Sequence, residues 1–186
     1  MKGELIDLEF RKKYISEKAT TILGAEPQSI EFIDVGALNY VFKVITEKGI
    51  IYFKQALDKA KRADKIGEDL AAIPKARIKY EKNVIEAVGK TPSEIVLPHI
   101  YEYDEENNIL IMSDVAQGGT LLENILLKND FNKLTAENIG KFLGIAHKRT
   151  LSKNIVIRSS AEEDKHNWEV FLNMRTRGIN APQKAK

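Results

Sequence analysis

The alternation of apolar and polar residues in the first third of the chain predicts one helix followed by three strands. Apolar residues between positions 5 and 23 recur at roughly helical spacing, and Gly24 ends the pattern, so we expect an amphipathic helix there. Short turns separate the β-rich runs that follow, which predicts an antiparallel meander of three strands. The three runs cover residues 29–35, 40–46 and 50–56.

A charged segment and a second helix come next. Residues 57–72 are highly charged and indicate a loop with a short helical piece. Residues 73–88 have helical spacing, with Pro74 in the first turn and Gly89 directly after the last. Proline is tolerated at a helix start and glycine ends a helix easily, so we expect the helix to fill this range.

The remainder of the pattern predicts a second hairpin and then helices. The hairpin is expected around the polar turn at 104–107, and a hinge-like break follows at 117–119. The strands of this hairpin are expected at 99–103 and 108–113, and the later helices at 121–127, 135–150 and 162–175.

Three strands, a helix and two more strands is the order of elements in a kinase small lobe. We therefore expect an α+β fold in which a protein-kinase-like small lobe, a five-stranded antiparallel sheet plus helix, precedes a partial helical lobe. Residues 1–115 would form the nucleotide-binding small lobe with its N-terminal helix. Residues 116–186 would form the hinge and a partial helical large lobe.

Composition restricts the classes of function. The 186 residues suffice for one domain or one and a half, and 29 basic against 27 acidic residues leave a net charge of +2. Acidic residues interrupt the small basic cluster at 59–65, as on a solvated surface, so we expect no nucleic-acid partner. The chain has no cysteine, no signal-like start and no long apolar run, which favours a cytoplasmic protein without a membrane partner.

Lys54, near the end of the third predicted strand, and Glu81, on the next predicted helix, are the most informative pair. Kinase-like enzymes hold nucleotide phosphates with such a lysine, and a helix carboxylate orients its flexible ammonium group. The ordinary alternatives are a solvated lysine and a surface carboxylate. Because side chains alternate along a strand, Lys54 and Tyr52 share one face of the predicted strand, opposite its more apolar face. A solvated lysine and a lysine in a nucleotide cleft would both lie on that face, so both interpretations stay open.

Two backbone segments are further candidates for nucleotide contacts. The first hairpin turn contains Gly36 and Asn39, and a turn of this kind covers phosphates with backbone donors in kinases. Asn39 could donate to a phosphate or stabilise its own turn. At the other end, Asp114 and Val115 follow the last predicted strand, where backbone groups would face an adenine edge. The alternative there is an ordinary connection from strand to helix.

Residues from about 30 to 150 resemble the small lobe of the aminoglycoside phosphotransferase and choline kinase-like superfamily, and within it the methylthioribose kinases most. The turn and the strand end are the more specific parts of this resemblance. The segments that carry it are Gly36-Ala37-Leu38-Asn39-Tyr40-Val41-Phe42, Phe53-Lys54-Gln55-Ala56-Leu57, Pro74-Lys75-Ala76-Arg77-Ile78-Lys79-Tyr80-Glu81 and Ile109-Leu110-Ile111-Met112-Ser113-Asp114-Val115. Residues 167–178 are similar to the start of the large lobe of such a family.

The resemblance implies an ATP site. Lys54 would contact the α- and β-phosphates and pair with Glu81. Gly36 and Asn39 would lie over the phosphates. The hinge contacts to adenine would come from Asp114 and Val115. A complete member of the family would transfer the γ-phosphate of ATP, with Mg²⁺, to a hydroxyl of a sugar or a similar small molecule.

The chain departs from the family at the catalytic loop. The family uses a His-x-Asp-x-x-x-x-Asn loop and a later acidic metal ligand. The nearest match begins at His147 and ends at Asn154, but Arg149 stands in place of the aspartate. We interpret this match as coincidental, because His147 continues an amphipathic helical run. We therefore predict no catalytic or metal-binding residue, and ATP as the cofactor, with Mg²⁺ only if the missing lobe is supplied.

Two functions of different classes follow. In the first, the chain is the ATP-binding part of a sugar-type, methylthioribose kinase-like phosphotransferase that is inactive alone. In the second, it is a non-catalytic nucleotide-binding or regulatory module that acts through a partner chain. Apolar side chains at the helical edge would then be covered by a homodimer or a partner chain. The side chains expected at this edge are Ile139, Phe142, Trp168 and Phe171.

Overall fold

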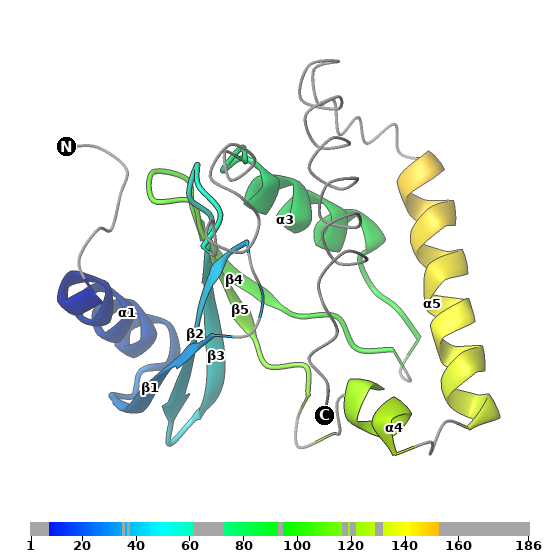
Figure 1. Cartoon of the computed structure of the whole chain (residues 1–186), viewed down its shortest axis with the longest axis horizontal. Coiled ribbons are helices and arrows are strands. Elements are labelled where there is room, and N and C mark those ends of the chain that lie inside the picture. The colour runs from blue at the N-terminus through cyan, green and yellow to red at the C-terminus, as the bar shows by residue number, and fades with distance from the viewer. Residues whose placement is uncertain are drawn as a thin grey trace, which may run out of the picture.

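A five-stranded antiparallel sheet with the order β1-β2-β3-β5-β4 organises this computed structural model (Figure 1). The structure describes residues 8–34, 36, 38–61, 73–92, 95–116, 119, 122–128 and 132–152. The strands are β1 (Pro27–Ile33), β2 (Tyr40–Thr46), β3 (Gly49–Gln55), β4 (Ile100–Asp104) and β5 (Ile109–Ser113). The helices are α1 (Leu8–Leu23), α3 (Arg77–Val88), α4 (Leu122–Leu127) and α5 (Lys133–Ser152).

The α+β fold class and the five-stranded antiparallel sheet are confirmed. Strand β2 has the predicted bounds, and from Val41 to Thr46 its side chains alternate between a half-buried and a buried face. Strand β1 begins two residues earlier than predicted, because Pro27 already pairs with Thr46 across an irregularity in the register. The hinge-like residues 117 and 118 and the helix predicted at 162–175 lie outside the described residues. None of the helices that the structure describes is long and apolar enough to cross a membrane.

Helix α3 begins at Arg77, four residues later than predicted. The amide of Ile73 donates to the carbonyl of Asp58, and the amide of Lys75 donates to the Asp58 carboxylate. These bonds hold Pro74 and its neighbours against the segment that follows β3, so the chain enters the helix through a turn. Proline therefore precedes the helix here instead of occupying its first turn.

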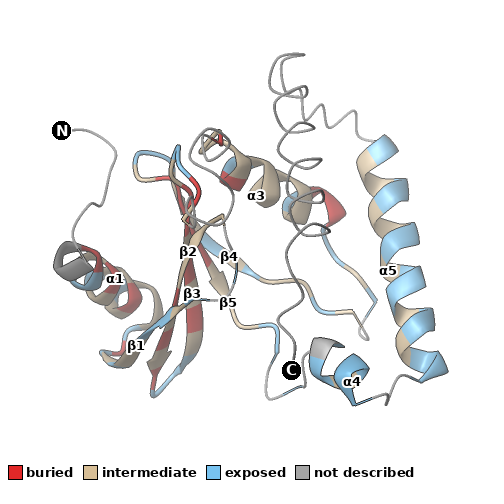
Figure 2. Cartoon of the chain, in the orientation of Figure 1, coloured by how far each residue is buried: buried red, intermediate tan, exposed pale blue. Residues whose placement is uncertain are grey.

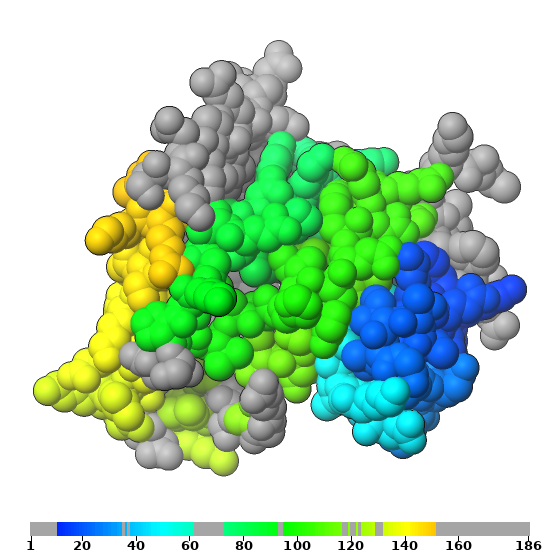
Figure 3. Space-filling view, turned by 180° about the vertical axis from the view of Figure 1, so that it is seen from behind, coloured from blue at the N-terminus to red at the C-terminus, as the bar shows by residue number. Residues whose placement is uncertain are grey.

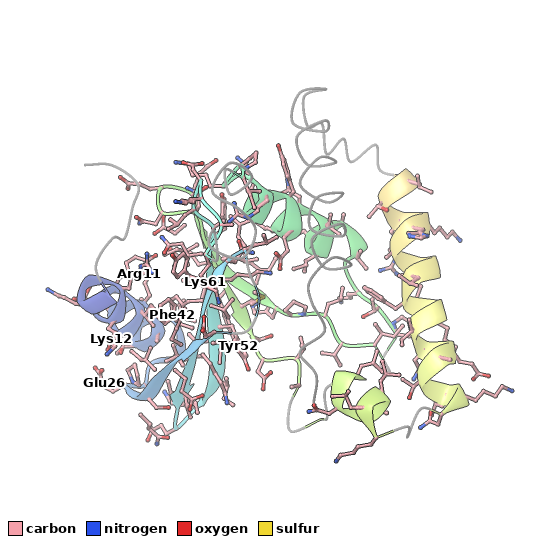
Figure 4. The ribbon with its side chains drawn as sticks, in the orientation of Figure 1. Arg11, Lys12, Glu26, Phe42, Tyr52 and Lys61 are labelled. Atoms are coloured by element: carbon pink, nitrogen blue, oxygen red, sulfur yellow. The ribbon has the colours of Figure 1, made fainter. Side chains whose placement is uncertain are left out.

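One face of the sheet packs against α1 and forms the larger core. Strands β2, β3 and β5 contribute alternate side chains to it, and α1 contributes two residues, as the buried positions in Figure 2 show. Every member is 3% exposed or less: Ile15, Ala19, Phe42, Val44, Ile51, Phe53, Ile109 and Ile111. Figure 4 shows Phe42 on the α1 side of the sheet and Tyr52 on the other side.

The opposite face packs against α3 through a smaller apolar cluster. Ile78 of α3, Leu110 of β5 and Ala56 are all completely buried there. Seen from behind, α5 lies along the segment that follows α3 (Figure 3), and the guanidinium of Arg149 donates to the carbonyls of Val88 and Lys90. The C-terminal end of α3 is therefore attached to α5 by hydrogen bonds.

Polar contacts fasten α1 to the edge strand β4. The hydroxyl of Tyr14 donates to Asp104 over 2.5 Å, and Lys18 pairs with Glu102 at 2.5 Å. Burial and then the hydrogen bond to Asp104 raise the pKa of Tyr14, so its hydroxyl stays protonated as a donor. Burial alone would raise the pKa of Asp104. Hydrogen bonds from Asn107 and Tyr14, together with Lys18, outweigh it and lower that pKa.

The change Tyr14→Phe tests this contact. We expect it to lower the free energy of unfolding by about 1.5 kcal/mol at pH 7, because a hydrogen bond to a charged group is lost. The lowered pKa of Asp104 gives stability that is present above the unfolded value, about 3.9, and is lost as pH falls through the folded value. Urea unfolding at pH 7 and pH 3 should therefore show a smaller loss at pH 3. The control is Tyr101→Phe on β4; an equal loss for both variants would contradict the prediction.

Candidate functional site

Lys54 and Glu81 are in direct contact on the α3 side of the sheet. The ammonium of Lys54 donates to both carboxylate oxygens of Glu81, each over 2.7 Å. The lysine side chain is 23% exposed and that of the glutamate 35%, so the pair is half-buried and still reached by solvent. The structure thus brings together the two residues that the sequence pairs across 27 positions.

The local structure explains why these two side chains meet. Neighbours of Lys54 on β3, Phe53 and Gln55, are buried on the α1 side, so strand alternation turns Lys54 toward α3. Ile78 is buried against the sheet, and Glu81 follows it by three positions, close to one helical turn. A half-exposed ion pair of this kind contributes only about 0.2–1 kcal/mol to stability. Its main physical effect is to hold a flexible ammonium group in one place.

The turn between β1 and β2 has an open and conformationally special glycine. Gly36 has a φ of +97°, in the region that favours glycine, and nothing lies within 4 Å of the place where a Cβ would stand. The backbone at Gly36 is therefore accessible to an approaching group. Its neighbours 35 and 37 lie outside the described residues.

Arg77, at the start of α3, binds this turn to the helix. Its Nε donates to Oδ1 of Asn39 over 3.0 Å, and Nη2 donates to the carbonyl of Leu38 over 3.1 Å. The other terminal nitrogen, Nη1, donates to three carbonyls: Leu57, Ile73 and Pro74. Burial lowers the pKa of Arg77, opposed by Asp58, but a guanidinium stays protonated in proteins. Sequence reasoning assigned Arg77 no role, although its position four residues before Glu81 places both on one helix face.

The segment after β5 contains two backbone groups that the sheet pairing does not use. The amide of Asp114 donates to the carbonyl of Ile50 and so extends the pairing of β3 with β5. The Asp114 carboxylate accepts from the amide of Ala116 over 2.9 Å. This leaves the carbonyl of Asp114 and the amide of Val115 without a hydrogen-bond partner among the described residues. Val115 itself is 45% exposed.

Tyr52 is a site candidate that sequence reasoning missed. It precedes Lys54 by two positions, shares its face of β3 and pairs in register with Met112 of β5. Burial, and then the charges of Asp114 and Glu31, raise the pKa of Tyr52. By its register, Tyr52 lies along β3 between Lys54 and the end of β5. The sequence did contain a signal for this residue, because Tyr52 and Lys54 are two positions apart on one strand and therefore share a face of the sheet.

The stretch that matches a catalytic loop in its histidine and asparagine spacing is helical from His147 to Ser152. His147 and Arg149 lie within α5, in agreement with the interpretation that this match is coincidental, and Arg149 binds carbonyls at the end of α3. Asn154 lies outside the described residues. Across the described part of the chain, no three acidic or histidine side chains gather as they do around a metal ion.

Comparison with known proteins shows a similarity to a kinase over part of the chain. No family model matches the chain. The chain is similar to the methylthioribose kinase of Exiguobacterium sibiricum, with 30% identity over 122 residues. The match covers 66% of this chain and 30% of that protein, so the chain spans about a third of its relative's length. This similarity supports a distant kinase-like relationship, and the narrower superfamily assignment stays a prediction.

The substitution Gly36→Ala tests the strained turn. We expect it to lower the free energy of unfolding by about 1–2 kcal/mol, because a side chain at this φ meets its own backbone. A matched control is Gly140→Ala in α5, where no atom lies within 4 Å of the added Cβ. That change should stabilise the protein by about 0.5–1 kcal/mol. Urea unfolding of both variants measures the difference, and a stabilising effect of Gly36→Ala would contradict the assigned backbone conformation.

Proposed function

We propose that the chain forms the ATP-binding lobe of a small-molecule phosphotransferase, of the sugar-type, methylthioribose kinase-like class. The observation that carries this proposal is the contact on the α3 side of the kinase-like sheet in which the Lys54 ammonium donates to both carboxylate oxygens of Glu81. The kinase homologue supports the same class of reaction. A lysine held in this way is a fixed positive charge suited to a polyphosphate.

The remaining groups fit the parts of a nucleotide. The open backbone at Gly36 and the side chain of Asn39 would lie over the phosphates, beside Lys54. Toward the segment after β5, the ring of Tyr52 would offer a flat apolar surface to the base. The carbonyl of Asp114 and the amide of Val115 would then be an acceptor and a donor for the edge of adenine.

In this proposal, the chain's own residues supply binding and orientation, and another segment completes the phosphoryl-transfer centre. The chain's sequence contains no His-x-Asp segment. Positioning and metal electrostatics supply most of the catalysis in phosphoryl transfer. We therefore assign no catalytic residue and no Mg²⁺ ligand to this chain, and we propose that turnover needs a catalytic loop from another polypeptide segment.

A second candidate is a nucleotide-binding or regulatory module that acts through a partner chain or a second copy. Exposed apolar side chains on the two later helices favour it: Leu122, Leu126, Leu127, Leu134, Ile139, Leu143 and Leu151. Of the side chains expected at this edge, Ile139 is 37% exposed and Phe142 is half-buried. Trp168 and Phe171 lie outside the described residues.

Calorimetric titration of Mg-ATP into the purified chain tests the first candidate. We expect binding that Lys54→Ala weakens by about ten- to a hundredfold, since a charge-assisted hydrogen bond is lost. Glu81→Gln should weaken it less, because the ammonium remains but loses its orientation. Lys18→Ala is a matched control, because Lys18 also pairs with a carboxylate but lies on α1. Failure of the folded wild-type chain to bind, or equal binding by Lys54→Ala, would refute the proposal.

Sedimentation velocity over a range of concentrations tests the second candidate. We expect self-association that the double variant Leu126→Glu/Leu143→Glu abolishes, because it places two charges on the exposed apolar surface of α4 and α5. Lys141→Glu, on the same helix as Leu143, is the control for the added charge. A wild-type chain that stays monomeric at all concentrations would exclude the homodimer and leave a different partner chain as the form of this candidate to test.

A further inference from the structure

The contact between Arg77 and Asn39 fixes which way the Asn39 amide points. An arginine side chain has donors and no acceptor, so only the oxygen of an asparagine amide can face it. The Nε of Arg77 lies 3.0 Å from Oδ1 of Asn39. The NH₂ group of Asn39 is therefore directed away from Arg77. Among the residues that the structure describes, it has no hydrogen-bond partner.

The guanidinium is itself held in a single orientation. Besides Asn39, it donates to carbonyls from three different parts of the chain. These are Leu38 in the turn, Leu57 after β3, and Ile73 with Pro74 before α3. A planar fork with this many partners cannot turn to another acceptor without losing several bonds. The orientation of the Asn39 amide is therefore set by the surrounding fold.

The register places this amide close to Lys54. Val41 pairs with Lys54, and Asn39 precedes Val41 by two positions, so Asn39 is a diagonal neighbour of Lys54 across the strand pair, at about 7–8 Å between Cα atoms. On α3, Arg77 and Glu81 stand four residues apart and lie on one face. The same helix face therefore positions the Asn39 amide through Arg77 and the Lys54 ammonium through Glu81.

We propose that Arg77 is a positioning residue that orients the Asn39 amide so that its NH₂ group donates to a phosphate of the nucleotide bound at Lys54. This inference rests on the proposed ATP-binding function and deepens it. Arg77 does not touch the ligand. It acts through the asparagine, in the way that Glu81 acts through the lysine.

The variant Asn39→Asp separates the two sides of the amide. Asn39→Asp keeps the oxygen that accepts from Arg77 and replaces the NH₂ donor with a second, negatively charged oxygen. We expect its free energy of unfolding to equal or exceed that of the wild type, while its affinity for Mg-ATP falls at least about tenfold. Asn138→Asp in α5 makes the same chemical change far from the turn, and it should leave the affinity unchanged. Unchanged ATP affinity of Asn39→Asp would overturn the inference.

A double-mutant cycle tests whether Arg77 acts through Asn39. Arg77→Lys keeps the charge and loses the fork, and we expect it to weaken Mg-ATP binding about five- to tenfold in the wild-type background. In the Asn39→Ala background it should cause no further weakening. An equal effect in both backgrounds would overturn the inference, because Arg77 would then act independently of the amide. A general loss of packing would also appear as equal effects.

The side-chain amide resonances of Asn39 give a measurement that does not depend on the folding of Arg77→Lys. In the wild-type chain, we expect the NH₂ pair to shift when Mg-ATP is added, while the Nε–H signal of Arg77 stays protected from exchange. An NH₂ pair that does not shift at saturating ATP would overturn the inference and leave the proposed function intact. A wild-type chain that binds no ATP at all would overturn both.

Discussion

The burial of Ile78 against the sheet is the constraint on which the site depends. This side chain is completely buried with Leu110 and Ala56, and it fixes how α3 is rotated on the sheet. Arg77 and Glu81 flank it in sequence, so the rotation that buries Ile78 also directs these two charged side chains toward the turn and toward β3. A helix with the same charges and a different buried face would direct them to solvent.

The two faces of the sheet have different chemistry, and this difference explains how a small fold can keep an open polar site. The α1 side buries a continuous set of large apolar side chains from three strands. Most of the apolar burial that stabilises the sheet is therefore concentrated there. The α3 side has a smaller apolar cluster and carries the half-exposed Lys54 and Tyr52. Polar groups can thus face a ligand without weakening the main core.

Local patterns predicted the sheet well and the arginine network not at all. The alternation in β2 is strong enough to set its bounds, and β3 begins and ends one residue earlier than predicted. The order of elements was enough to pair Lys54 with Glu81. The predicted start of α3 was wrong, because Asp58 binds the residues around Pro74 before the helix begins. The partners of Arg77 are mostly main-chain carbonyls, which every residue has, so no sequence pattern marks them. For Asn39, the sequence left open a contact within its turn or a phosphate contact, and the structure adds a third contact, to α3.

Helix α3 is held by an arginine at each end, and this has a consequence for binding entropy. Arg77 attaches its first residues to the turn, and Arg149 of α5 binds the carbonyl of Val88, the last residue of α3, and that of Lys90 just beyond it. Both ends are held by hydrogen bonds in the folded chain, and Glu81, between them, holds the lysine ammonium in one place. An anion that reaches Lys54 therefore meets a charge whose conformational freedom has already been lost, and little of the binding free energy is spent on ordering it.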